Sequence, residues 1–467
     1  MRLGRVINNS VALILLDFLN KAIPFVVFPW VVRALGPAVY GQLGYAGAVA
    51  GFFGLLASPG FTSYALREAA RDPANVPFLA RHVLGARMVF AVGAFLALVV
   101  FTLFFAPQDG ETRLLIVLSG LAFVTGSLDT QWIFAARSRM WVIAGQGALG
   151  QLAYAGLILA LVRGSRDAWI VPTAAVVSSI LTASLIWLRA RHEYNIPLPK
   201  FSPRAWRVFL PISLVIGFAS LMSLIYDQID TVMIKYFRTD TELGMYVASY
   251  GLMTAAMSFL PILGQVFMPL LSESAGQDAG EQTTYLRWLG RATVGLALPI
   301  AVGGFILAVP LSKFVLGNQY PNSGILLRWL MLTLLTGPLA SYYGSQLIPN
   351  NRERKYLFSV GVGAIANVVL NLFLIPKYGA IAAALTTALS QGVVAFFNYW
   401  FVRDLLRPSL WASVALSVPA TCLMAVSINE LSMAYHLQVV LLVGVGGLLY
   451  LFLYGLSLVV WNRVSAH

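Results

Sequence analysis

Charge is scarce in this sequence, and its scarcity excludes most classes of soluble protein. Charged residues make up 10% of the 467 residues and hydrophobic residues 59%, whereas ordinary soluble domains have about 25% charged and about 45–50% apolar residues. Apolar stretches of about 20 residues, long enough to cross a bilayer as helices, recur from one end of the chain to the other. The composition therefore predicts an integral membrane protein with many spans.

The residues that usually build disulfides, metal sites and cofactor sites are also few. Cys422 is the only cysteine, so no intrachain disulfide forms, and the four histidines lack the spacing of a zinc site. Residues 145–150 (GQGALG) match the dinucleotide-binding pattern by letter, but they lie in an apolar span without a preceding strand. No Walker or nucleophile motif occurs. We therefore expect no metal, no cofactor, no catalytic residue and no enzymatic activity.

The apolar runs are continuous, which favours helices over the alternating strands of a membrane barrel. We expect an all-α integral membrane fold with about 14 transmembrane helices, joined by connections of about 10 residues that are too short to hold a further domain. The expected spans cover approximately residues 8–32, 40–65, 82–106, 114–136, 141–162, 168–188, 207–234, 243–271, 288–310, 324–348, 356–376, 379–402, 410–428 and 437–461.

Lysine and arginine are distributed unevenly between the two sides of the membrane. Of the 31 basic residues, 20 lie in one set of alternate connections and nine in the other. Because cytoplasmic loops collect basic residues, this bias predicts that both termini face the cytoplasm. The net charge of +13 is then an orientation signal. No stacking aromatics are interleaved with the basic loops in an aqueous segment, so we expect no nucleic-acid partner.

The longest basic connection divides the chain after six spans. The next six spans start with the same orientation, so the two sets form parallel repeats, and a faint internal echo places Gly41 (LGPAVYGQLGYA) against Gly244 (DTELGMYVASY). This arrangement predicts a two-lobed transporter with two additional helices. The expected parts are an N-lobe at 1–190, a basic cytoplasmic linker at 191–206, a C-lobe at 207–403 and two additional C-terminal helices at 404–467.

Charged residues inside spans are the candidate functional residues, because each costs about 2.5–3.5 kcal/mol near mid-bilayer unless it faces protein or water. Asp17 lies near the middle of the first span, and Asn20 and Lys21 follow on the same helix face. One interpretation is a hydrated lumen in which Lys21 meets an anionic head group and Asp17 binds a coupling proton or ion. The other is a structural pair of Asp17 and Lys21.

Four further charged residues complete the set of candidates. Arg87 either snorkels to the cytoplasmic surface or supplies a second lumenal cation that grips a phosphate. Asp129 lies in the fourth span, and Asp227 and Asp230 form an i, i+3 pair at the exofacial end of the seventh, where they are rim or coupling candidates. Amides within spans either hydrogen-bond sugar hydroxyls or join helices. These amides are Gln146, Gln151, Gln265, Gln346, Asn367, Asn371, Gln391 and Asn398.

Four ordered stretches carry a family resemblance over nearly the whole chain. They are LGPAVYGQLGYAGAVAGFFGLLASPGFTSYALREAARD, QWIFAARSRM, YDQIDTVMIKYFRTDTELGMYVASYGLM and NLFLIPKYGAIAAALTTALSQ. Together they resemble the polysaccharide-transporter branch of the multidrug/oligosaccharidyl-lipid/polysaccharide (MOP) superfamily, which includes the Wzx-type O-antigen flippases.

The resemblance implies a fold, a substrate and a location. It implies 14 helices in two six-helix lobes around a central cavity, and transfer of an undecaprenyl-diphosphate-linked oligosaccharide across the bacterial inner membrane by alternating access. Cationic lumens are typical of such flippases, a pattern that Lys21 and Arg87 fit. Asp230 matches an aspartate that precedes the turn at Gly244 and Tyr246, without an assigned role.

The expected function is therefore a flippase for O-antigen, as in lipopolysaccharide, or another surface polysaccharide unit. Its expected partners are the lipid-linked oligosaccharide, the bilayer, a coupling ion or proton, and polysaccharide-assembly proteins. A cation-coupled multidrug antiporter of the MATE type is the alternative, because Asp17 resembles the acidic residue in the first helix of that branch. A membrane glycosyltransferase or polymerase ranks last, because the outer connections are too short for its catalytic loop.

Overall fold

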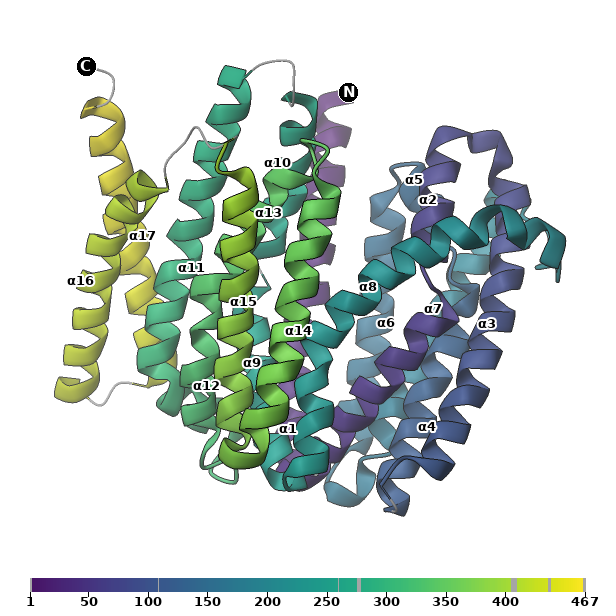
Figure 1. Cartoon of the computed structure of the whole chain (residues 1–467), viewed down its shortest axis with the longest axis horizontal. Helices are drawn as coiled ribbons and strands as arrows, with labels where there is room; N and C mark the ends of the chain where they lie inside the picture. Colours follow the sequence, from purple (N-terminus) through teal and green to yellow (C-terminus); the bar gives the residue numbers. More distant parts are fainter. Residues whose placement is uncertain are drawn as a thin grey trace. The chain divides into compact units, whose positions relative to one another are not determined.

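The computed structural model describes residues 2–107, 109–258, 260–274, 279–404, 410–435 and 438–464. All regular secondary structure within these ranges is helical, as the composition predicts (Figure 1). The chain divides by its internal contacts into two compact units, Met1–Lys235 and Tyr236–His467. The boundaries of the lobes and linker expected from the sequence stay a prediction.

The first unit is a bundle in which α1 packs against α3, α4 and α6, and α7 packs against α4 and α6. Short 3₁₀ turns occupy Pro73–Asn75 (η1), Gly126–Leu128 (η2) and Ser165–Asp167 (η3). Its helices are α1 (Arg2–Ala57), α2 (Phe61–Arg71), α3 (Val76–Phe104), α4 (Gly110–Thr125), α5 (Gln131–Ala136), α6 (Met140–Leu161), α7 (Ile170–Tyr194) and α8 (Pro203–Phe237), of which α8 belongs to this unit up to Lys235.

The first expected span and most of the second lie within the single helix α1. Its ribbon changes direction at Gly36, whose φ of 73° and ψ of 167° are not helical, and the two arms are visible in Figure 1. Only glycine adopts this backbone conformation without strain, and Pro37 follows it. Thirteen helical segments of the described chain are long and apolar enough to cross a membrane, and the first of them, Ala22–Ala57, contains this kink.

Two expected spans end earlier than the apolar pattern suggests. The second was expected to reach residue 65, but α1 ends at Ala57 because Pro59 lacks an N–H and Gly60 is left-handed, with φ 77°. The fourth, expected at 114–136, breaks after Thr125 into η2 and the short α5. The carbonyls of Gly126 and Asp129 at this break accept hydrogen bonds from Arg87.

In the first unit, hydrogen bonds join connections that the charge bias assigns to the same, cytoplasmic side of the membrane. Arg137 donates to the carbonyl of Pro73 at 3.0 Å, and the N–H of Lys200 donates to the carbonyl of Arg81 at 2.9 Å. A core of buried aromatic side chains, including Trp132, lies beneath them. These contacts agree with the expectation that successive connections lie on alternate sides of the membrane. The cytoplasmic position of the termini stays a prediction.

The regular secondary structure of the second unit is also helical in its described residues. In it α15 packs against α13 and α14, and α11 packs against α12, α16 and α17. Glu242 of α9 accepts the backbone N–H of Ala380 at 2.7 Å and so caps the start of α15. Its helices are α9 (Asp240–Met257), α10 (Leu260–Ser274), α11 (Ala279–Leu316), α12 (Ser323–Met331), α13 (Thr333–Leu347), α14 (Glu353–Tyr378), α15 (Ala380–Val402), α16 (Trp411–Tyr435) and α17 (Val439–Val464).

Candidate functional site

The first unit contains a polar hollow of about 410 Å³ within its membrane-spanning helices. Its wall belongs mainly to α6 and α7 and contains amides and hydroxyls in place of the aliphatic side chains that dominate the rest of these helices. We call this hollow the polar pocket. It is lined by Gln131, Gln146, Gly147, Gly150, Gln151, Tyr154, Ala175, Ser178, Ser179 and Thr182.

Helical periodicity brings these residues to one place. On α6, Gln146, Gly150 and Tyr154 are spaced four residues apart, so they lie on one face of the helix. Their positions span about 9–21 Å from the start of α6 at 1.5 Å per residue, which places the polar pocket deep within the span. On α7, Ser178 and Thr182 have the same four-residue spacing and face α6.

Two glycines of the GQGALG segment make the close packing here possible. A Cβ on Gly150 would lie 2.7 Å from Cγ2 of Thr182, and a Cβ on Gly147 would lie 3.0 Å from Oδ1 of Asn20. Both glycines therefore give neighbouring side chains access to the α6 backbone. The segment that resembles a dinucleotide motif by letter is a packing surface and part of the pocket wall.

The hydrogen bonds of the polar pocket leave an acceptor unused. Nε2 of Gln146 donates to the carbonyl of Thr182 at 2.9 Å, and the hydroxyl of Ser178 donates to the carbonyl of Gly150 at 2.7 Å. Oε1 of Gln146 is buried and has no hydrogen-bond partner among the described residues. A buried acceptor without a donor costs about 1–3 kcal/mol, so a ligand hydroxyl or water that donates to it is stabilised.

Asn20, a candidate from the sequence, lies beside the polar pocket. Its Nδ2 donates to the carbonyl of Ala144 on α6 at 3.1 Å, and its Oδ1 is buried without a partner in the described part of the chain. The structure thus joins one predicted lumenal residue to the pocket wall through Gly147. The side chains of the predicted residues Asp17 and Lys21 lie outside the described residues.

The structure also brings Arg87 and Asp129 together. Arg87 is 8% exposed, and its two terminal nitrogens donate to the carbonyls of Asp129 at 2.7 Å and Gly126 at 2.9 Å. The carboxylate of Asp129 accepts the N–H of Gln131 at 2.9 Å, and burial raises the pKa of this carboxyl. Arg87 thereby holds the break between α4 and α5, while its role towards substrate stays a prediction.

The pair Asp227 and Asp230 is split between two environments on α8. Asp227 is exposed, whereas Asp230 is 2% exposed. Near the end of the same helix, the ammonium of Lys235 lies 5.8 Å from the ring centre of Tyr45. Assignment of either aspartate to a rim or coupling role stays a prediction.

Three of the candidate amides in the second unit hold helices together. Asn367 and Asn371 are fully buried and hydrogen-bond to each other at 3.0 Å, and they bind Ser390 and Thr386 of the neighbouring α15. Asn398 donates to the carbonyl of Ala340 at 3.0 Å. Between the two interpretations of such amides, these three are interhelical contacts. The side chain of Gln265 lies outside the described residues.

Sequence reasoning identified Gln146 and Gln151 but missed Gln131 and the hydroxyl residues of the pocket. The available signal was the run VSSILTAS in α7, whose hydroxyls recur four residues apart opposite the amides of α6. This signal is weak, because a serine or threonine in a membrane helix commonly bonds its own preceding turn. Thr182 does so, donating to the carbonyl of Ser178 at 2.8 Å.

The fold and the pocket together define a polytopic helical membrane protein of the transporter type. Residues 6–275, more than half of the chain, match the family model described as polysaccharide biosynthesis protein. The chain therefore belongs to the polysaccharide biosynthesis protein family.

Three known proteins are similar to this chain over most of its length. A protein of Escherichia coli (strain K12) that is named as an O-antigen transporter is 21% identical over 412 residues, covering 85% of this chain and 96% of that protein. The lipid II flippase MurJ, solved in an inward closed conformation, superposes with a TM-score of 0.71 at 14% identity, covering 99% and 100% of the two chains. A MATE-family multidrug transporter of the MOP superfamily has a TM-score of 0.60 at 14% identity, with coverage of 84% and 95%. The two structural likenesses show the fold.

Proposed function

We propose that this chain is a flippase that moves a lipid-linked oligosaccharide across a bacterial inner membrane by alternating access. The cargo is an undecaprenyl-diphosphate-linked unit of O-antigen or another surface polysaccharide. Membership of the polysaccharide biosynthesis family, similarity over 85% of the chain to a protein named as an O-antigen transporter, and the fold shared with a lipid II flippase support this assignment. The chain acts as a transporter and performs no covalent chemistry on its cargo.

The observation that carries the proposal is the polar pocket. A sugar presents many hydroxyls that donate and accept hydrogen bonds, and the pocket offers amides and hydroxyls deep in an apolar bundle. The buried amide oxygen of Gln146, a lining residue, lacks a donor among the described residues, so a sugar hydroxyl that reaches it satisfies it. A few placed polar groups in a concave site are what fixes a ligand's orientation.

The pocket assignment is tested in host cells that lack this chain. We expect those cells to lose surface polysaccharide and to accumulate lipid-linked units, and the wild-type chain to restore export. Replacing the amides by apolar side chains of similar length, as Gln146→Met with Gln151→Met, should lower export at least tenfold because sugar hydroxyls lose their partners. The matched control Leu149→Met lies on an exposed, apolar part of the same helix and should export normally. Full export by the double variant contradicts the assignment.

The alternative is a cation-coupled multidrug antiporter, which the MATE-like fold and the predicted position of Asp17 favour. Such a transporter raises drug resistance in cells without other pumps and couples drug efflux to proton or ion uptake. We expect no gain of resistance from this chain. Substrate roles for Lys21 and Arg87, coupling through Asp17, Asp129, Asp227 or Asp230, and contacts with polysaccharide-assembly proteins are further parts of the proposal.

A further inference from the structure

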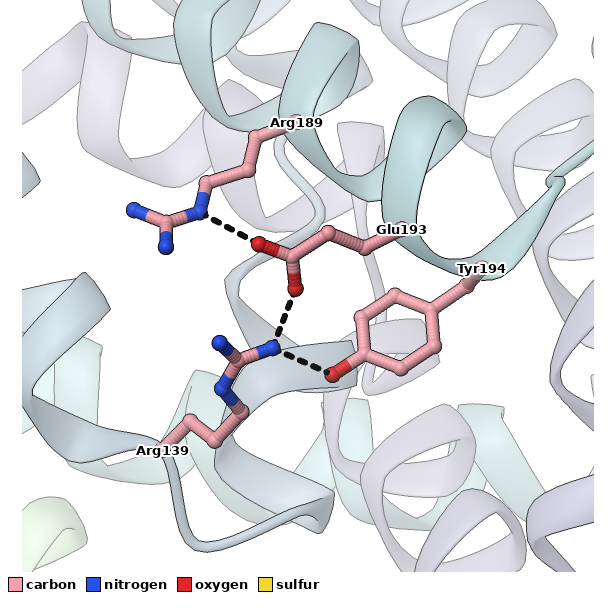
Figure 2. Close-up of polar contacts among 4 residues, drawn as sticks. All are labelled: Arg139, Arg189, Glu193 and Tyr194. Atoms are coloured by element: carbon pink, nitrogen blue, oxygen red, sulfur yellow. Dashed lines mark hydrogen bonds and ion pairs between the residues drawn. The ribbon is translucent and has the colours of Figure 1, made fainter.

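Two arginines share one carboxylate where α6 begins and α7 ends. Arg139 donates to Oε2 of Glu193 and, at 3.2 Å, to the hydroxyl of Tyr194. Arg189 donates from Nε to Oε1 of Glu193 at 2.8 Å. Figure 2 shows the carboxylate of Glu193 between the two guanidinium groups. Glu193 therefore orients both cations while neutralising only one of their two charges.

An aromatic side chain fixes the same two cations from a second direction. The guanidinium carbon of Arg189 lies 4.7 Å from the ring centre of Trp141, and that of Arg139 lies 5.8 Å from it. Contacts of this kind attract a cation to the face of the ring. A guanidinium held by a carboxylate and a ring loses little further freedom when it binds an anion.

The two guanidinium groups have N–H donors that are not used in the bonds to Glu193 and Tyr194. Arg189 reaches Glu193 through Nε alone, and in Figure 2 its two terminal nitrogens point away from the carboxylate. The side chains of Arg139 and Arg189 are 35% and 38% exposed, so an anion in solution or in a membrane surface has access to them. Parallel N–H groups of this geometry match the oxygens of a phosphate.

The surroundings place this pair at a membrane surface. Met140 and Trp141 begin α6 and are 48% and 46% exposed, and tryptophan is enriched at the level of lipid head groups. The charge bias assigns this end of α6 and α7 to the cytoplasmic side. Lipid phosphates therefore lie at the height of Arg139 and Arg189.

The pair is aligned with the polar pocket along the same two helices. Arg139 immediately precedes α6, seven residues before Gln146, and Arg189 follows Thr182 by seven residues within α7. Each arginine therefore lies about 10 Å from the pocket along the helix axis at 1.5 Å per residue, and Arg189 lies on the same side of α7 as Thr182. Both sets of residues connect α6 to α7. Gln146 bonds the backbone of Thr182, and Arg139 bonds Glu193 near the end of α7. A phosphate bound at the arginines directs its attached sugar towards the pocket.

We propose that Arg139 and Arg189 form a binding site for the phosphate of a lipid head group at the cytoplasmic membrane surface. The ligand chemistry is a phosphate or diphosphate ester on a lipid. Its two sources are the diphosphate of the glycan lipid, which rests on the proposed function, and the phosphate of an anionic phospholipid. In the first case the site receives the cargo before its sugar enters the polar pocket.

Binding of two probes to the purified full-length protein in nonionic detergent tests this site. We titrate farnesyl diphosphate and, separately, dihexanoyl phosphatidylglycerol, and measure each dissociation constant by calorimetry. Arg139→Gln and Arg189→Gln should each weaken binding about tenfold or more, because a charge-assisted bond is lost. A loss confined to farnesyl diphosphate identifies the glycan lipid as the ligand, and a loss confined to phosphatidylglycerol identifies a phospholipid.

Two further variants separate binding from folding. Arg191→Gln removes a nearby arginine that stacks on Trp187 at 5.3 Å and should change either affinity less than threefold. Glu193→Gln keeps an amide oxygen for the guanidiniums and removes a competing negative charge, so phosphate affinity should rise or hold.

The inference is overturned if both arginine variants remain folded and bind both probes as the wild-type protein does, or if Glu193→Gln weakens binding as much as they do. Its failure is distinct from failure of the proposed function. A wild-type protein that binds phosphate through these arginines but moves no glycan lipid refutes the flippase alone.

Discussion

Arg87 is a full positive charge kept among apolar helices by backbone carbonyls. Its two bonds to Gly126 and Asp129 occupy the terminal nitrogens, and its Nε has no partner among the described residues. Because Arg87 has this structural role, replacing it changes the stability of the protein as well as its charge. A test of Arg87 as a substrate-binding cation is therefore difficult to interpret. Lys21→Ala is therefore the sharper test of the predicted cationic lumen.

Replacing Arg87 should destabilise the protein strongly. Arg87→Ala removes two charge-assisted hydrogen bonds, so the free energy of unfolding should fall by about 3 kcal/mol. Arg87→Lys should recover only part of the loss, because an ammonium cannot bridge both carbonyls in the same plane. The melting temperature in detergent measures the effect, with the exposed Arg81→Ala as the control. Equal melting temperatures for Arg87→Ala and Arg81→Ala would refute the structural role.

Residue by residue, the sequence indicates only some of the pocket's amides, and Gln131 of the short α5 is not among them. Amides inside an apolar span are rare enough to be noticed, so Gln146 and Gln151 of the lining and Asn20 beside it were identified. Ser178 and Ser179 were not, because small hydroxyls occur throughout membrane helices and bond their own backbone without consequence. The sharing of Glu193 by two arginines was also beyond prediction, because it depends on how α6 and α7 pack.

At the scale of elements, α6 and α7 approach closely because glycines remove side chains at their interface. Gly150→Ala should lower the free energy of unfolding by about 1–3 kcal/mol, because its Cβ would lie 2.7 Å from Thr182, whose side chain has few rotamers. Gly145→Ala is the matched control, since nothing lies within 4 Å of its added Cβ. Thermal unfolding compares the two. Equal stability of both variants would mean that the interface has more space than the structure shows.

In the second unit, an ion pair joins the start of α14 to the segment that follows α15. Arg352 grips both carboxylate oxygens of Asp404, at 2.7 and 2.6 Å, and this bond lowers the pKa of Asp404 to about 2. Because the folded pKa lies below the ordinary value near 3.8, the pair stabilises the fold above about pH 4 and loses its effect as pH falls towards 2. Asp404 is largely exposed, so the contribution is below about 1 kcal/mol.

The melting temperatures of the wild-type protein and Asp404→Asn test this pH dependence. Their difference should be constant between about pH 5 and 7 and should shrink as the pH is lowered to 3. Glu353→Gln, one residue along from Arg352, is a control for a general loss of negative charge. A difference that persists unchanged at pH 3 would show that the carboxylate does not titrate as its contact with Arg352 requires.

Apolar length predicted nearly every membrane-spanning helix but not where several of them break. A run of hydrophobic residues records only that a segment prefers lipid. The breaks at Gly60 and after Thr125 depend on one left-handed glycine and on a guanidinium from another helix. The turn at Gly36 is similar, since its direction depends on how the two arms of α1 pack.

At the scale of the whole molecule, the charge bias predicts a definite orientation in the membrane. We replace the single cysteine by Cys422→Ala and introduce either Arg166→Cys or Arg71→Cys, both at exposed positions. A membrane-impermeant maleimide added to intact cells should label the first and not the second, because residue 166 lies in the outer set of connections and residue 71 in the cytoplasmic set. Labelling of residue 71 alone would reverse the topology.

Transport by the purified protein tests most directly whether this chain moves a lipid-linked oligosaccharide across a bilayer. The protein is reconstituted into liposomes with a fluorescent undecaprenyl-diphosphate-linked oligosaccharide, and a reducing agent added outside quenches only the outer leaflet. If the chain is a flippase, the quenched fraction rises well above that of protein-free liposomes. An unchanged quenched fraction, with folded protein and intact vesicles, would show that the chain does not flip this lipid.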